Sequence, residues 1–311
     1  MRVVIDTDAA NEIDDPFAIA WALLRPDRLK VEAFYATPYS FAHRRAQMAV
    51  QQHPQFDPPD IGMERSHAAI VEVFDKLGLD AKGRVHRGST RYIAALDAPE
   101  RSAATDHLIA TAMAMPDDEP LYVVAIGCAT NVANALLIEP RIAERIVVVW
   151  TSGYPSHAPQ VNDSFNLEQD LLASQWLLDS GVPHVYLPGF HVGAQLRLSL
   201  PEMERWVRGR GAIGEHLFDL YTHNPLWPLL GIASFEAHSW VIWDLICIAG
   251  CSIRPGCQAP SCARRAWAPT GAGWPMRGGT RCARRTRCSG MRSSVRSSRR
   301  CPAIGDLGRQ E

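Results

Sequence analysis

Five acidic residues crowd the start of the chain. A short apolar run, residues 3–5, leads into carboxylates, and two more carboxylates stand directly before an apolar stretch of helical period; the five are Asp6, Asp8, Glu12, Asp14 and Asp15. Carboxylates that converge repel one another, and a bound cation is the simplest way to remove that repulsion. The sequence therefore predicts a metal site that contains Asp8, Asp14 and Asp15.

The elements around this cluster indicate a parallel sheet. Residues 3–5 read as a buried strand, residues 16–24 as a helix with Asp15 as its N-cap, and residues 31–36 as a second strand. A strand, a helix and a strand in this order form the crossover unit of a parallel sheet. Ligands of such sheets gather at the carboxyl ends of the strands, which is where Asp8 is expected.

Strands and helices alternate along most of the remaining body. Further strands are predicted at residues 84–89, 121–126, 145–151 and 184–187, and further helices at residues 68–77, 102–113, 132–138 and 168–178. This alternation favours an α/β fold with a mostly parallel, Rossmann-like sheet flanked by helices. Residues 201–243 become helical and aromatic, as in segments that cover a pocket, and another helix opens at Trp243 with Asp244 near its start.

The chain changes composition near residue 250. Residues 251–311 hold 13 arginines, no lysine, two acidic residues and six of the eight cysteines, so the formal charge of −1 hides an acidic body and a basic tail. We predict a body of residues 1–250, truncated in mid-helix, and a tail of residues 251–311 that is disordered or read out of frame. A basic arm that binds nucleic acid is the alternative interpretation of the tail.

The body carries no pattern typical of export or membrane insertion. Asp6 and Asp8 interrupt the apolar stretch at the N-terminus, and no apolar run reaches about 18 residues. Cys128 and Cys247 lie in apolar surroundings and are expected to be reduced core residues. These features predict a cytoplasmic protein.

The acidic cluster has other possible uses. An EF-hand fails, because its sixth and twelfth positions would be Asn11 and Phe17 instead of Gly and Glu. A phosphatase with an aspartyl nucleophile is a stronger alternative, but such enzymes usually need a later lysine and the last one here is Lys82. In a third interpretation Asp15 only caps a helix and the other carboxylates are solvated, which leaves their clustering unexplained.

Four segments together resemble the inosine-uridine-preferring nucleoside hydrolase superfamily. Asp6-Thr7-Asp8 and the pair Asp14-Asp15 match the family's opening Asp-x-Asp loop and Asp-Asp pair, and residues 124–131 match its Thr-Asn loop. Phe165-Asn166 matches its ribose-binding segment, and Trp243-Asp244 falls at its last metal-binding aspartate. The loop between Asp8 and Asp14 is two residues longer than in the best-known members and lacks their Pro-Gly. A divergent subfamily is therefore expected.

The resemblance implies a nucleoside hydrolase fold and a calcium-dependent reaction. The implied calcium ligands are Asp8, Asp15, the backbone carbonyl of Thr130, and Asp244. Asp8 would also be the general base for the attacking water, while Asp14 and Asn166 would bind the ribose hydroxyls. Oxygen ligands suit calcium, and a ring of carboxylates stabilises an oxocarbenium-like transition state.

The expected function is hydrolysis of the N-glycosidic bond of a purine or pyrimidine ribonucleoside, which releases base and ribose. The alternative from another class is a non-catalytic relative that binds a nucleoside or sugar, and a phosphatase comes third. The expected partners are a small-molecule nucleoside and, from the resemblance, further copies of the chain in a dimer or tetramer, with no nucleic acid and no membrane. An out-of-frame tail could leave this particular chain inactive.

Departures from the family's pattern leave the substrate open. Many members have Glu where this chain has Ser164, so one ribose contact is missing, and several have His where this chain has Trp243. An indole cannot protonate a leaving base, but it can stack on one. The group that activates the leaving base therefore remains open among five histidines, which are His86, His157, His191, His223 and His238.

Overall fold

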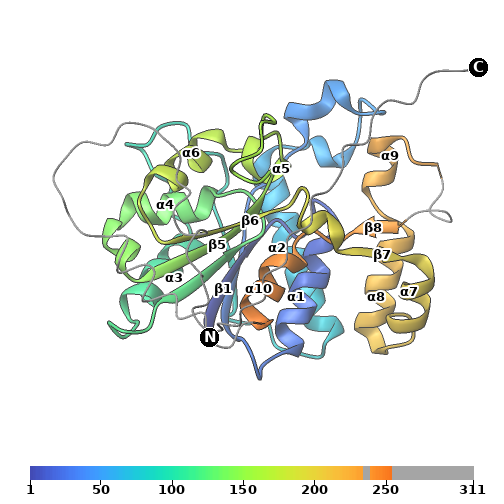
Figure 1. Cartoon of the computed structure of the whole chain (residues 1–311), viewed down its shortest axis with the longest axis horizontal. Coiled ribbons are helices and arrows are strands. Elements are labelled where there is room, and N and C mark those ends of the chain that lie inside the picture. Colours follow the sequence, from blue (N-terminus) through green and yellow to red (C-terminus); the bar gives the residue numbers. More distant parts are fainter. Residues whose placement is uncertain (234–238, 254–311) are drawn as a thin grey trace, which may run out of the picture. The chain divides into compact units, whose positions relative to one another are not determined.

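A parallel sheet of six strands forms the centre of the protein in a computed structural model that describes residues 1–233 and 239–253 (Figure 1). The strand order is β3-β2-β1-β4-β5-β6. The strands are β1 (Arg2–Thr7), β2 (Lys30–Ala36), β3 (Val85–Arg87), β4 (Leu121–Ala125), β5 (Ile146–Ser152) and β6 (His184–Pro188). Apart from residues 251–253, the tail predicted for residues 251–311 lies outside the described residues.

The predicted fold class is confirmed by this sheet. All neighbouring strands of the six run parallel, and β5 is buried along its whole length, as expected for a strand covered on both faces. The order reverses between β1 and β4, which makes that point the topological switch point of the sheet. Open α/β sheets bind their ligands in the crevice at the carboxyl ends of the strands on either side of such a point.

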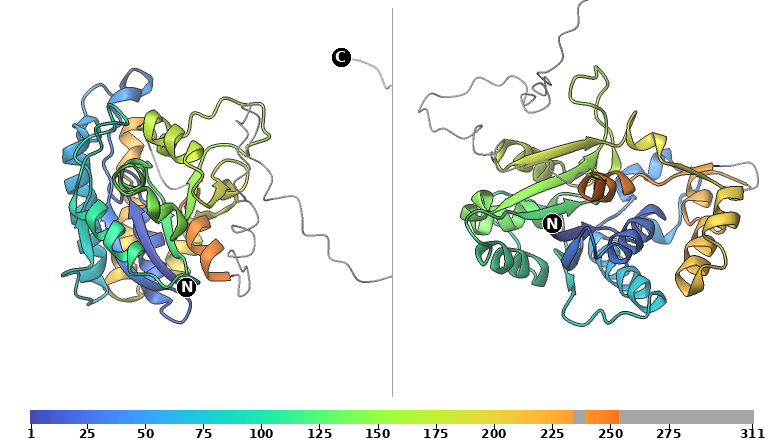
Figure 2. Two further views of the ribbon diagram at one scale, coloured as in Figure 1. Left: turned by 90° about the vertical axis from the view of Figure 1, so that its left-hand side faces the viewer. Right: turned by 60° about the horizontal axis from the view of Figure 1, so that its bottom comes forward.

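Helices cover the two faces of the sheet (Figures 1 and 2). One face packs against α1 (Asp14–Leu24), α2 (Pro59–Lys76) and α10 (Leu245–Ile253), and the other against α3 (Ala103–Met113), α4 (Thr130–Ile138) and α6 (Leu171–Asp179). Each face has its own apolar core, with Ile5 and Phe34 in the first and Val4 and Trp150 in the second. The free cysteines Cys128 and Cys247 are both buried, as expected.

A helical addition follows the sixth strand. It contains a short antiparallel pair, β7 (Arg197–Ser199) with β8 (Ser239–Val241), and the helices α7 (Leu200–Trp206), α8 (Gly211–Thr222) and α9 (Leu226–Leu230). The remaining helical turns are α5 (Phe165–Glu168), η1 (Ala42–Gln47), η2 (Pro54–Phe56), η3 (Pro140–Glu144) and η4 (Gly193–Gln195). No helix in residues 1–233 and 239–253 is long and apolar enough to cross a membrane.

Three local predictions were wrong. The first helix begins at Asp14 with Ile13 as an N-cap that makes no side-chain bond, and Asp15 does not cap it because its carboxylate accepts a bond from the Thr7 hydroxyl. The helix predicted at residues 68–77 already begins at Pro59. The helix predicted at residues 168–178 is broken into α5 and α6, because Asp170 caps the second helix at the Ala173 amide, 3.0 Å away.

Candidate active site

The loops after β1, β4 and β5 meet the start of α10 around one cavity of about 230 Å³. The cavity therefore lies at the switch point of the sheet. Its walls come from distant parts of the chain, and the polar and aromatic side chains of interest among them are Glu12, Asp14, Phe165, Asn166, Trp243 and Asp244.

Three carboxylates converge at the base of this region. One oxygen atom from each of Asp14, Asp15 and Asp244 lies within 4.8 Å of the others, and all three residues are buried. Asp14 and Asp15 occupy the first turn of α1, where the helix dipole favours negative charge. The turn between β8 and α10 brings Asp244 to them, and the backbone amides of Trp243 and Asp244 bond the Asp14 carboxylate.

Asp8 is fixed beside this group by two amide side chains. Its Oδ2 accepts hydrogen bonds from Asn11 Nδ2 at 2.6 Å and from Gln169 Nε2 at 3.3 Å. Its Oδ1 is buried and has no hydrogen-bond partner in the described part of the chain. The loop after β4 passes so close that a Cβ at Gly127 would lie 2.8 Å from this oxygen. The free oxygen therefore requires glycine at position 127.

Burial makes these carboxyl groups harder to ionise. Burial raises the pKa of Asp6 to about 8 and, together with the charge of Asp14, that of Asp8 to about 7. The pKa of Asp14 rises to about 6, and those of Asp15 and Asp244 lie well above their usual range for the same reason, reinforced by their mutual charges. A nearby cation would reverse this effect, because it favours the ionised form.

The residues present fit a hard divalent cation. Besides Asp8 Oδ1, the buried Oδ2 of Asp15 has no hydrogen-bond partner among the described residues. The convergent donors are all oxygen atoms, and oxygen donors of this kind suit calcium or magnesium, whereas zinc and copper favour nitrogen and sulfur. Of the predicted ligands Asp8, Asp14 and Asp15, the structure groups Asp14 and Asp15 with Asp244, and Asp8 lies outside this group of three.

Of the other two predicted site residues, Asn166 lines the same cavity and Thr130 does not. Thr130 is the buried first residue of α4, and its hydroxyl donates to Asp170 Oδ2 at 2.7 Å, so its backbone position is firmly held. Asn166 donates its amide nitrogen to the Ile126 carbonyl at 2.9 Å and to the Thr151 carbonyl at 3.3 Å. Its own carbonyl oxygen is the atom left to meet a ligand in the cavity.

Aromatic side chains form another part of the wall. The indole of Trp243 packs over Gly189 and Gly193 and meets Phe190 edge-on, with ring centroids 5.8 Å apart. Phe165 is stacked on Phe41 at 4.1 Å. Flat aromatic faces of this kind suit a planar ring such as a nucleobase.

No histidine lines the cavity in the described part of the chain. His86 stacks on His107 beside β3, His157 and His223 are exposed on the surface, and His191 packs against Tyr154. His238 lies outside the described residues.

Sequence reasoning assigned no role to Glu12 and Gln169. Glu12 was counted in the acidic cluster, and its place in the longer loop was the signal that could have singled it out. Burial and the charge of Asp14 hold its pKa well above the usual range. Gln169 carries no local signal, since only the folded chain brings it to Asp8.

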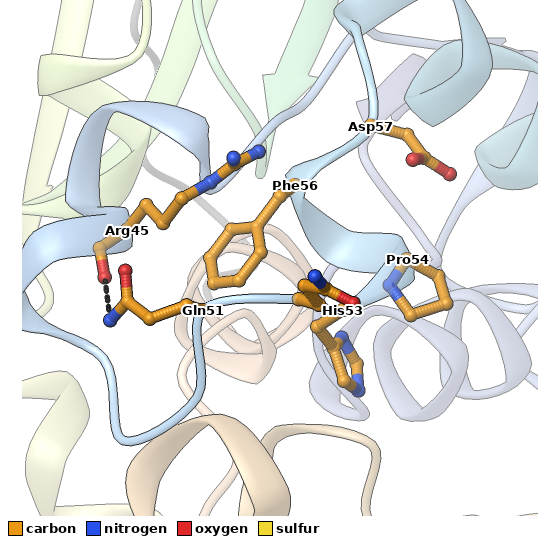
Figure 3. Close-up of a pocket in the computed structure, with 7 residues that line it drawn as sticks. Arg45, Gln51, His53, Pro54, Phe56 and Asp57 are labelled. Atoms are coloured by element: carbon orange, nitrogen blue, oxygen red, sulfur yellow. Dashed lines mark hydrogen bonds between the residues drawn. The ribbon is translucent and has the colours of Figure 1, made fainter.

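A larger hollow, of about 480 Å³, lies on the surface over η1 and η2 (Figure 3). The Arg45 guanidinium lies over the Phe56 ring, 4.8 Å from its centre, and the Gln51 side chain bonds the Arg45 carbonyl. Its one carboxylate, Asp57, is paired with Arg65. With no converging polar groups, this hollow is not a candidate for catalysis.

The sequence matches the profile of the inosine-uridine preferring nucleoside hydrolase family over residues 3–251. The chain belongs to this family. The match includes the four acidic residues Asp8, Asp14, Asp15 and Asp244. Membership makes it a relative of metal-dependent hydrolases that act on nucleosides, and a search among curated proteins found no match.

Solved structures of low sequence identity share the fold. A purine-preferring ribonucleoside hydrolase from Gardnerella vaginalis is 20% identical with a TM-score of 0.58, and the match covers 81% of this chain and 80% of that one. A plant nucleoside hydrolase is 18% identical with a TM-score of 0.55, over 81% of this chain and 79% of that one. The type III effector protein XopQ, solved with adenosine diphosphate ribose, is 15% identical with a TM-score of 0.55, over 84% and 82%.

Proposed function

We propose that this protein hydrolyses the N-glycosidic bond of ribonucleosides and releases the free base and ribose. The observation that carries the proposal is the convergence of Asp14, Asp15 and Asp244, with Asp8 beside them. Asp14 and Asp244 also line the cavity, together with Asn166 and Trp243. Carboxylates on one side and an aromatic wall on the other match the two halves of a nucleoside.

Asp8 is the proposed general base. Its Oδ2 is held by Asn11 and Gln169, so the carboxylate keeps one orientation, and its free Oδ1 can take the proton of the attacking water. The water oxygen bonds to the anomeric carbon while the bond from that carbon to the base nitrogen breaks. The base leaves with the electron pair of that bond and takes up a proton from solvent. The positive charge that develops on the sugar is stabilised by the surrounding carboxylates.

Calcium is the proposed cofactor, held by Asp8, Asp15, the Thr130 carbonyl and Asp244. When bound, it would polarise the attacking water and offset the repulsion among the carboxylates. Asp14 and the carbonyl oxygen of Asn166 are the proposed partners of the ribose hydroxyls. Both lie in the cavity wall, and both are fixed by backbone contacts before any ligand binds.

Trp243 is the proposed stacking surface for the leaving base. We expect Trp243→Ala to lower kcat/KM for a nucleoside by about 10- to 100-fold, because stacking a base on an aromatic ring contributes about 1–3 kcal/mol. Trp206→Ala is the matched control, since Trp206 is exposed on α7 and lies outside the cavity. Steady-state kinetics of both variants check this, and an equal loss in the two would contradict the stacking role.

The direct test of the proposed function is to incubate the full chain with inosine or uridine and to measure reducing sugar. Release of ribose in calcium but not in excess chelator is the expected result. Nucleoside binding without sugar release would instead identify a non-catalytic binder, and turnover of a generic phosphate ester would identify a phosphatase.

Some expectations from the sequence stay proposals. We propose that residues 1–250 form the body and that residues 251–311 are a tail that is disordered or read out of frame. We also propose that the chain forms a homo-oligomer and that it is located in the cytoplasm. Resequencing the gene near codon 251 tests the tail, because a single clean frame in independent isolates would exclude the frameshift. Sedimentation of the purified chain tests the oligomer.

A further inference from the structure

Glu12 is a half-buried carboxylate in the cavity wall that the proposed reaction does not use. It lies in the loop between Asp8 and Asp14, the loop that is two residues longer than in the best-known family members. A carboxylate in such a place loses part of its hydration, so its position calls for a partner.

The structure supplies one fixed partner for Glu12. Its Oε1 accepts a hydrogen bond from the indole nitrogen of Trp240 at 2.7 Å, across 228 positions of the chain. Trp240 is itself packed against Trp227, with ring centroids 6.4 Å apart, and against the apolar group that contains Tyr39 and Phe41. The orientation of the carboxylate is therefore fixed by a packed side chain, as a substrate-binding group requires.

The sugar of a nucleoside presents three hydroxyl groups to this cavity. The proposed function uses Asp14, Asn166 and the cation for the 2′ and 3′ hydroxyls, which leaves the 5′ hydroxyl without a partner. Ser164 stands where many family members have glutamate, but its hydroxyl is bonded to the Ser152 hydroxyl. Among the residues that line the cavity, Glu12 is the carboxyl group to which the proposed function gives no role.

We propose that Glu12, held by Trp240, binds the 5′ hydroxyl of the substrate and makes the site selective for nucleosides that carry it. This inference rests on the proposed function. Trp240 is a positioning residue, since it touches the Glu12 carboxylate and acts through it. Hydrogen bonds to charged groups are strong enough to discriminate against an analogue that lacks one partner.

The test compares inosine with 5′-deoxyinosine on the full chain in calcium. The wild type should prefer inosine by about 10- to 100-fold in kcat/KM, and Glu12→Ala should lose this preference while it keeps the wild-type rate on 5′-deoxyinosine. Trp240→Phe should lower the preference in the same direction, because it removes the indole donor. Glu64→Gln, on the surface in an ion pair with Arg87, is the control and should change neither rate.

The outcomes separate this inference from the proposed function. If Glu12→Ala lowers both rates equally, Glu12 has only a structural role and the inference is overturned. If the wild type releases no free sugar from either compound, the proposed function fails, and calorimetry of the same two compounds then tests Glu12 by binding alone. Equal affinity of the wild type for both, or no binding of either, would overturn the inference as well.

Discussion

Asp8→Ala should abolish ribose release, with kcat lowered by about 10²- to 10⁴-fold or more. Loss of a positioned general base accounts for a decrease of that size, and loss of a proposed metal ligand adds to it. The geometry supports a large effect, because Asp8 is held by Asn11 and Gln169 and keeps one oxygen without a hydrogen-bond partner among the described residues. Release of reducing sugar from inosine, at saturating substrate and calcium, measures it.

Asp27→Ala is the matched control. Asp27 is an exposed aspartate that pairs with Arg25 at 2.9 Å, and exposed ion pairs contribute little to stability. Its ribose release should stay at the wild-type level. If both variants lose activity equally, or if Asp8→Ala keeps it, Asp8 is not the base.

Unfolding does not account for the expected loss. Burial raises the pKa of Asp8 to about 7, so its charge is costly to the folded protein in the absence of a cation. In excess chelator at pH 8, Asp8→Ala should therefore have a Tm at least as high as that of the wild type. Calorimetry of the two proteins separates a catalytic defect from a folding defect.

The sheet could be predicted from the sequence because its strands are continuous apolar runs. The predicted bounds of β4 differ from the observed ones by one residue at one end, and those of β5 differ by one residue at each end. The first turn of α1 could not be predicted in the same way. There the contact between Asp15 and Thr7 competes with capping, and local propensity contains no information on that contact.

The identity of the candidate site residues was easier to predict from the sequence than the contacts among them. The family resemblance predicted Asp244 as a site residue. In the structure its carboxylate lies beside those of Asp14 and Asp15. The hydrogen bond between Glu12 and Trp240 was not predictable, since it joins residues 228 positions apart and no local pattern pairs them. Only packing decides which distant polar groups meet.

Calcium should stabilise the protein more at high pH than at low pH. The folded-state pKa values of Asp14, Asp8 and Asp6, about 6, 7 and 8, lie above the usual value of 3.8. Without a cation the folded protein thus binds more protons than the unfolded chain, so its stability is full below about pH 4 and falls as the pH rises toward 8. For Asp14 alone the difference amounts to about 3 kcal/mol.

The measurement is Tm in calcium and in chelator at pH 5.5 and pH 8. Metal ligands must be deprotonated, so the calcium-dependent increase should be larger at pH 8, by roughly 5–10 °C when calcium is at 100 times its Kd. Half-buried His184, whose pKa is lowered to about 4 by desolvation, adds a trend of opposite sign, but it lies outside the cluster and its effect cancels in the difference between calcium and chelator. Asp244→Asn should reduce the increase at both pH values, and an increase that is equal at both pH values in the wild type would show that these carboxylates do not bind the cation.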